Sequence, residues 1–322
     1  MSTSPAAAPS RQLPRAGREF AVVFVIMLVV VAVAPFVAYP FFVMQALCFA
    51  LFACAFNLLI GYVGLLSFGH AMFLGLASYV CAHAAKVWGL DPVLAILTGV
   101  ASSALLGLIA GALSIRSQGI YFAMITVALS QMIFFFCVEA PFTHGEDGIQ
   151  AVPQGFAFDL IDLSRPLALY SFTAAIFLFG FLAIYRTVNS PFGEILKAIR
   201  ENEARAISLG YRVARYKLTA FVLSASLAGL AGATKAIVVQ NASLTDVGFA
   251  MSGEVVLMTL LGGMGTLYGP VVGALVVVSM QNYLAQYGEW VTVIQGAVFI
   301  ACVLVFRRGV VGEIANAFKW SI

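Results

Sequence analysis

Apolar runs long enough to cross a lipid bilayer recur along this sequence, and they restrict its fold more than any other feature. A transmembrane helix needs about 20 apolar residues. The runs occupy residues 20–38, 41–60, 63–85, 91–113, 119–139, 167–185, 218–240, 252–285 and 291–306. Because lipid offers no partner for backbone polar groups, such runs form helices that bond internally. We predict an all-α polytopic membrane protein with about 8–10 transmembrane helices, some interrupted by glycine.

Composition and missing motifs narrow the function. The 322 residues are 62% hydrophobic and 10% charged, whereas soluble domains are about a quarter charged. The formal net charge is +3, and no basic tract with interleaved aromatics suggests nucleic acid. The five cysteines lie in apolar runs without metal-ligand spacing. No phosphate loop or HExxH motif occurs. We expect no metal site and no enzyme, and favour transport.

Charged residues predict the orientation, because Lys and Arg favour the cytoplasmic side. Basic residues before the first run and in the segment 186–217 place both regions inside, whereas the mostly acidic segment 140–166 lies outside. The run 20–38 could pass as a signal peptide, but a retained span is favoured because apolar character continues to Leu59. A cytoplasmic C-terminus then requires 252–285 to cross twice or to be a broken helix.

These considerations divide the chain into parts. We expect a disordered cytoplasmic N-terminus at 1–19, a transmembrane permease domain at 20–312 with a cytoplasmic loop at 186–217 and an external loop at 140–166, and a cytoplasmic tail at 313–322.

Two glycine-interrupted segments, 61–79 and 261–275, are candidates for a transport site, because paired broken helices often surround one. Ordinary small-residue helix packing is an equally good interpretation. The candidate translocation residues are Ser67, Gly69, His70, Gly263 and Gly265. If the first segment is helical, Ser67 and His70 share a face.

Other polar residues in the apolar runs have simpler interpretations. His70 is more readily a neutral, hydrogen-bonded group between helices than a ligand or proton relay. Lys235 and Glu254 are expected near the outer surface, where they could reach water. Asn57, together with Gln131 and Gln295, is expected to donate hydrogen bonds between helices.

The segment "SPFGEILKAIRENEARAISLGYRVARYK", residues 190–217, concentrates charge unlike any other part of the chain. Ser190 can cap a helix that starts at Pro191 and ends before Gly210. Its predicted apolar side comprises Phe192, Ile195, Leu196, Ile199, Ala206 and Leu209. Glu201 and Arg205 have the favourable i,i+4 order. We expect a helix of about 19 residues at the inner surface that docks another protein; an interfacial helix on lipid and a solvated loop are the alternatives.

Several motifs together resemble permeases of branched-chain amino acid ABC importers, the LivM/LivH type. They are "NLLIGYVGLLSFGHAMFLGLASY" (57–79), "IRSQGIYFAMITVALSQM" (115–132), "GEDGI" (145–149), "ENEARAISLGYRVARYKLTAF" (201–221) and "LLGGMGTLYGPVVGA" (260–274). They occur in order over most of the chain. The "GIYFA" and "GEDGI" segments are more similar to the LivM-like subunit than to its LivH-like partner.

The resemblance implies an ABC-importer permease fold in a bacterial inner membrane, surrounded by lipid. The implied partners are a second, LivH-like permease, two ATPase subunits that bind ATP, and a periplasmic binding protein that delivers an amino acid. No cofactor is implied for this chain. The residues expected to couple it to the ATPase are Arg200, Glu203, Ala204, Arg205 and Gly210. Gly210 falls one residue later than in the general importer motif, and His144 stands where the family is expected to have Gly.

Two other transport functions and one non-transport function are alternatives. Relatives that import urea, amides or aromatic acids would share these motifs. An ion-coupled secondary transporter would use His70 or Glu254 as ion sites. A membrane scaffold would use the charged segment to bind a partner that is not an ATPase.

Overall fold

The computed structural model describes residues 13–157, 161–284, 286, 288, 290–305, 309 and 311–313. Its helices are α1 (Leu13–Val37), α2 (Pro40–Asn57), α3 (Ala71–Lys86), α4 (Pro92–Ser114), α5 (Ile120–Glu139), α6 (Pro166–Val188), α7 (Pro191–Glu201), α8 (Glu203–Ser208), α9 (Val213–Val239), α10 (Phe249–Gly262), α11 (Gly269–Leu284) and α12 (Trp290–Val305). A π-helical stretch, η1 (Leu58–Val63), continues α2. Short 3₁₀ turns are η2 (Pro141–Thr143), η3 (Gly145–Asp147) and η4 (Leu244–Asp246).

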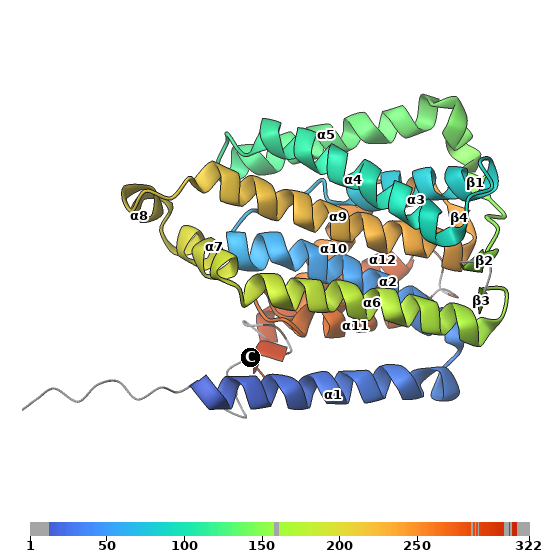
Figure 1. The fold of residues 1–322 in the computed structure, drawn as a ribbon, viewed down its shortest axis with the longest axis horizontal. Coiled ribbons are helices and arrows are strands. Elements are labelled where there is room, and N and C mark those ends of the chain that lie inside the picture. The colour runs from blue at the N-terminus through green and yellow to red at the C-terminus, as the bar shows by residue number, and fades with distance from the viewer. Residues whose placement is uncertain are drawn as a thin grey trace, which may run out of the picture.

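The long helices lie side by side and run between two ends of a bundle (Figure 1). We call the end with α7 and α8 the α7 end, and the opposite end, with the short strands, the strand end. The strands are β1 (Ile149–Gln150), β2 (Phe156–Ala157), β3 (Ile161–Asp162) and β4 (Asn241–Ala242). β1 pairs antiparallel with β4, and β2 with β3.

Five helical stretches of the described chain are long and apolar enough to cross a membrane. They are Pro40–Val63, Pro92–Ser114, Ile120–Glu139, Pro166–Val188 and Val213–Val239. Shorter apolar helices, α10 and α11 among them, share the bundle. The prediction of an all-α polytopic membrane protein is confirmed.

Small residues let α9 lie at the centre of the bundle. Ala225, Ala228, Ala231 and Gly232 are all buried there, and α9 packs against α2, α3 and α4. A Cβ atom on Gly232 would overlap the backbone carbonyl of Leu74 in α3. Close approach of helix backbones through small residues is typical of membrane bundles, where dispersion and packing drive association.

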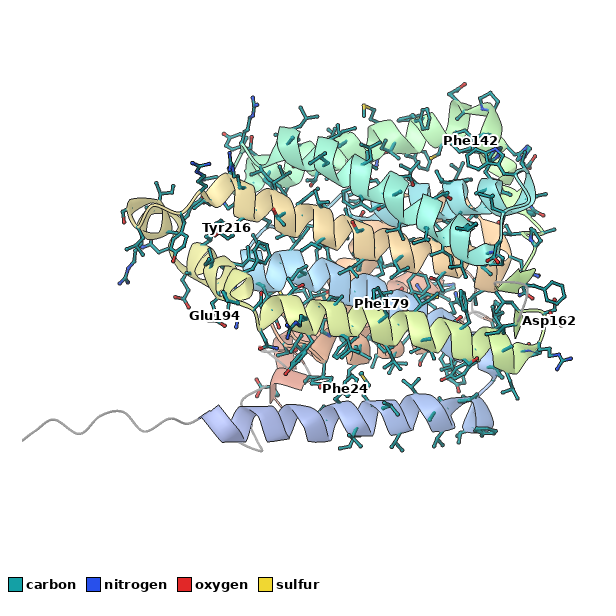
Figure 2. The ribbon with its side chains drawn as sticks, in the orientation of Figure 1. Phe24, Phe142, Asp162, Phe179, Glu194 and Tyr216 are labelled. Carbon is teal, nitrogen blue, oxygen red and sulfur yellow. The ribbon has the colours of Figure 1, made fainter. Side chains whose placement is uncertain are left out.

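Most of α2 and η1 is buried among the other helices, whereas α4 and α5 keep much of their apolar surface exposed. Large side chains such as Leu105 of α4 and Phe135 of α5 point out of the bundle. Figure 2 shows Phe179 of α6 likewise on the outer surface, where it is 67% exposed. Such surfaces fit a lipid surrounding.

The run 252–285 contains two helices, as one of the two predicted solutions requires. α10 runs towards the α7 end, the chain turns at 263–268, and α11 returns (Figure 1). Gly309 packs against Gly263 in that turn, so the chain beyond α12 has returned to the end where α1 starts. The start of α1 and Gly309 thus lie at the same end of the bundle.

The N-terminal prediction needs one correction. α1 begins at Leu13, so residues 13–19, expected to be disordered, belong to a helix. Pro14 lies in its first turn, where a missing N–H removes no helical bond. Residues 1–12 and most of the expected C-terminal tail lie outside the described residues.

Candidate functional site

The first half of the charged segment folds as expected. Pro191 occupies the first turn of α7, and the Ser190 side chain accepts a hydrogen bond from Gly193 N at 3.4 Å. Glu194 in the first turn and Arg200 in the last complement the helix dipole. Leu196 and Ile199 are buried beneath the helix. Phe192 of α7 stacks on Tyr216 of α9, with centroids 5.7 Å apart (Figure 2).

The prediction of a single 19-residue helix is wrong, because Asn202 interrupts it. Asn202 has φ −156° and ψ 96°, an extended conformation, and its side chain accepts a hydrogen bond from Arg205 N at 2.9 Å. An Asn at this position caps a new helix instead of continuing the old one. The chain therefore forms two helices, α7 and α8, and α8 projects beyond the bundle (Figure 1).

The break at Asn202 also changes which side chains are buried on α8. Ala206 packs with Ile199 and Val213 in a small apolar cluster, as expected. Leu209 was expected on the same side but is 69% exposed, and Ile207 is 58% exposed. Ala204 and Arg205 are exposed as well.

The ion pairs of α7 and α8 differ from the pair that the sequence predicts. Among the described residues, Glu201 does not form the expected ion pair with Arg205. Glu194 pairs with Lys197 at 2.8 Å on the surface of α7. Glu203 pairs at 2.8 Å with Lys217, whose side chain is 7% exposed. Glu203 therefore ties α8 to α9, an attachment that the spacing of charges along one helix could not reveal.

The ends of the two broken helical segments meet beside α7. Asn57 donates from Nδ2 to Thr266 O at 2.8 Å and accepts from Gly265 N at 3.0 Å through Oδ1. A Cβ on Gly61 would lie 2.8 Å from Gly265 N, so only glycine permits this approach. Arg200 of α7 donates from Nη1 to Gly61 O. We call Asn57, Gly61, Arg200, Gly265 and Thr266 the junction.

The predicted hydrogen bond of Asn57 between helices is therefore confirmed, although its role in joining the two glycine segments was missed. Gln131 lies half-buried on α5. Gln295 of α12 is buried, but its Nε2 finds no partner among the described residues. The expected hydrogen bond from Gln295 to another helix is therefore not found among the described residues.

The segment around His70 lies apart from the junction. The chain is irregular at 64–67 and turns before α3, so Ser67 and His70 do not share a helical face as expected. His70 is fully buried, and its Nε2 lies 3.2 Å from Ser224 Oγ, which itself donates to Ala55 O. His70 accordingly donates to Ser224, and its ring packs among phenylalanines. This matches the expected hydrogen-bonded histidine between helices.

Ser67 and Gly69 are also buried near the start of α3. The Ser67 hydroxyl has no partner among the described residues. A Cβ on Gly69 would meet the backbone of Thr126 in α5. Of the five predicted translocation residues, the structure thus places Gly265 in the junction and Gly263 in the same turn, while Ser67, Gly69 and His70 have other neighbours. A pathway role for any of the five stays a prediction.

Lys235 does not reach water as expected. It is 8% exposed and pairs with Asp246 of η4, which is 1% exposed. Its Nζ also lies 5.3 Å from the ring centroid of Phe49. Glu254 is partly buried and accepts a hydrogen bond at 2.9 Å from Gln281 of α11. Asp246 lies 11 residues after Lys235 and outside its helix. The spacing of residues along a helix could therefore not predict this partner of Lys235.

A second set of contacts joins the loops at the strand end. Beyond the β1–β4 pairing, Val152 N donates to Gln240 O at 3.1 Å, and Lys86 Nζ donates to Gln150 O at 2.7 Å. His144, where the sequence departs from the expected family pattern, has φ 60°. Glycine adopts such a conformation at less cost than histidine, and the expected Gly fits it.

The bundle of broken and continuous apolar helices, with an ordered charged element at one end, defines a polytopic membrane protein of the transport type. The profile of a protein family described as "Branched-chain amino acid transport system / permease component" matches residues 38–303. That range covers most of the chain, which therefore belongs to this family.

Individual relatives agree with the family match. The high-affinity branched-chain amino acid transport system permease protein LivM of Salmonella typhimurium is 26% identical over 311 residues, which cover 86% of this chain and 72% of the relative. LivM of Escherichia coli is 25% identical over 315 residues, with the same coverage. The ribose import permease protein RbsC of Bacillus subtilis is 27% identical over 234 residues, covering 69% of this chain and 70% of the relative. No solved structure gives a significant match.

Proposed function

We propose that this chain is one permease subunit of an ABC importer that moves an amino acid, branched-chain by preference, into a bacterial cell. It pairs with a second, related permease in the inner membrane. A periplasmic binding protein delivers the solute at the strand end. Two ATPase subunits bind and hydrolyse ATP at the α7 end, so this chain makes and breaks no covalent bond and needs no cofactor of its own. Family membership supports this assignment.

The observation that supports docking of an ATPase is the exposed apolar surface at α8. Ile207 of α8 and Leu209, which directly follows α8, are exposed at the α7 end, next to the exposed Ala204 and Arg205. Two exposed apolar side chains on a short, capped and anchored helix fit a cleft of another protein. The basic residues of 186–217 gather at the same end and favour the cytoplasmic side, where the ATPase subunits would be.

Docking is tested by placing a charge on that surface. Ile207→Asp and Leu209→Asp are each expected to remove the ATPase subunits from the purified complex, because a carboxylate would be buried unpaired in the interface. Co-purification should fall at least about tenfold, a scale set by burial of one unpaired charged group. The measurement is the ratio of ATPase to permease after affinity purification from membranes.

Leu167→Asp is the matched control. Leu167 is 58% exposed near the start of α6, at the strand end, so the same chemical change is made far from α8. This variant should keep the ATPase bound. Glu203 is unsuitable for the test because its loss would leave Lys217 unpaired. Retention of the ATPase by both α8 variants would contradict the proposal.

The solute is proposed from the relatives. Two relatives are named for branched-chain amino acids and one for ribose, so the family accommodates different solutes. We expect the reconstituted importer to take up leucine, isoleucine or valine only with ATP and the binding protein. Uptake by this chain alone, driven by an ion gradient, would instead support the secondary transporter. Uptake of urea, an amide or an aromatic acid in place of these amino acids would change the proposed solute but not the proposed ABC importer.

A further inference from the structure

Arg200 is exposed as a whole, but the end of its side chain contacts the bundle. It lies in the last turn of α7, and its guanidinium donates to the carbonyl of Gly61. Its aliphatic portion passes under Gly64, where an added Cβ would lie 3.1 Å from Arg200 Cγ. The side chain is thus used along its length for contact with the end of η1.

The carbonyl that Arg200 bonds belongs to the C-terminal end of a long buried helix. α2 and η1 form one helical stretch, Pro40–Val63, and Gly64 ends it with φ 80°. The last carbonyls of a helix lack intrahelical partners and carry partial negative charge. A guanidinium at this position both satisfies a carbonyl and complements the dipole.

The same helix end is fixed to the turn between α10 and α11. Both polar groups of the Asn57 amide are used, one on Gly265 N and one on Thr266 O. Gly263, which belongs to the same turn, also contacts Gly309 beyond α12. Arg200 therefore touches a unit that combines two helix breaks and the last described part of the chain.

The contact has free space beside it. A cavity of about 430 Å³ lies beside it, lined by Gly61, Tyr62, Lys197, Arg200, Glu201 and Gly265. The bond joins a side chain to a backbone carbonyl at the edge of this cavity and not in the packed core. Tightly packed interfaces shift between discrete arrangements, and free space beside a polar contact permits such a shift.

We propose that Arg200 is the positioning residue that transmits movement of α7 to the junction, and through Asn57 to the α10–α11 turn. It acts inward and is not an ATPase contact. This inference rests on the proposed docking of an ATPase at α8, and it assigns the next step: α8 receives the movement, α7 carries it, and Arg200 passes it to the broken helices.

The test separates transmission from docking. Arg200→Ala in the reconstituted importer is expected to keep the ATPase subunits bound, while uptake and the stimulation of ATP hydrolysis by the loaded binding protein both fall roughly tenfold, the scale of one hydrogen bond to a charged group. Arg200→Lys should recover part of both, since an ammonium still caps the helix end. Glu194→Ala, in the first turn of the same helix and away from the cavity, is the control and should change neither.

A double variant tests the route through Asn57. If both residues act in one chain of contacts, Asn57→Ala added to Arg200→Ala should lower uptake no further than the stronger single variant, whereas independent effects would multiply. Should Arg200→Ala not accumulate, Arg200→Gln, which keeps a long polar side chain without the charge, takes its place.

Three results would overturn the inference. They are full uptake by the Arg200 variants, loss of the ATPase from them, and an equal defect in Glu194→Ala. Each differs from failure of the docking proposal, in which the α8 variants themselves retain the ATPase.

Discussion

Replacing Gly232 with alanine is expected to destabilise the protein by about 3 kcal/mol or more, at the upper end of the cost of overpacking a core. Gly232 lies in α9, where an added Cβ would overlap the carbonyl of Leu74 in α3. The neighbour is backbone within a helix, so it cannot move aside without separating α9 from α3. The measurement is the melting temperature of the purified protein in detergent, together with its accumulation in membranes.

Gly253→Ala provides the matched control. Gly253 also lies within a helix, α10, but nothing is found within 4 Å of an added Cβ. Alanine favours the helix over glycine by about 0.5–1 kcal/mol, so this variant should be neutral or slightly stabilised. Equal melting temperatures for the two variants would contradict the assignment of a close α3–α9 approach at Gly232.

Gly232 also shows what the sequence could and could not predict about packing. The apolar runs and their turns were predicted, because hydrophobicity is a property of consecutive residues. Nothing in "GLAGATKA" indicates which glycine faces another backbone. That depends on which helix lies opposite, and Leu74 is far away in the sequence.

The candidate site was predicted in outline and missed in detail for a similar reason. Ser190, Pro191 and Gly210 are local signals, and they correctly mark where the helical part of the charged segment starts and ends. Asn202 is a local signal as well, since Asn favours helix caps, but the amphipathic pattern on both sides outweighed it. The capping preference of Asn202 is therefore a signal in the sequence for the break between α7 and α8.

The inward direction of Arg200 and the pairing of Glu203 with Lys217 are long-range features. The sequence prediction places Arg200 and Glu203 among the residues that couple the chain to the ATPase. The structure gives each a partner in the bundle instead and leaves Ala204, Ile207 and Leu209 exposed. Contacts within the bundle, and not burial, thus distinguish Arg200 and Glu203, which hold the docking element, from the exposed residues that are available for docking.

The buried pair of Lys235 and Asp246 leads to the second large prediction. Lys235→Met is expected to destabilise the protein by about 3–5 kcal/mol, because it leaves the Asp246 carboxylate buried without its counter-charge. One oxygen of Asp246 already lacks a partner among the described residues, so little else is present to compensate. Asp246→Leu should cost a similar amount, because among the described residues it leaves the ammonium with the Phe49 ring alone.

The double variant, Lys235→Met with Asp246→Leu, should recover much of the loss, since a buried pair can be replaced by apolar side chains at little net cost. Melting temperatures of the four proteins give the coupling free energy. Lys197→Ala, which breaks the surface pair with Glu194, should shift stability by about 0.5 kcal/mol or less. If the double variant is as unstable as the sum of the singles, the two charges are not coupled. If the double variant regains stability, the two charges are coupled. The pair then helps to attach the loop before α10 to α9, and two apolar side chains can do the same.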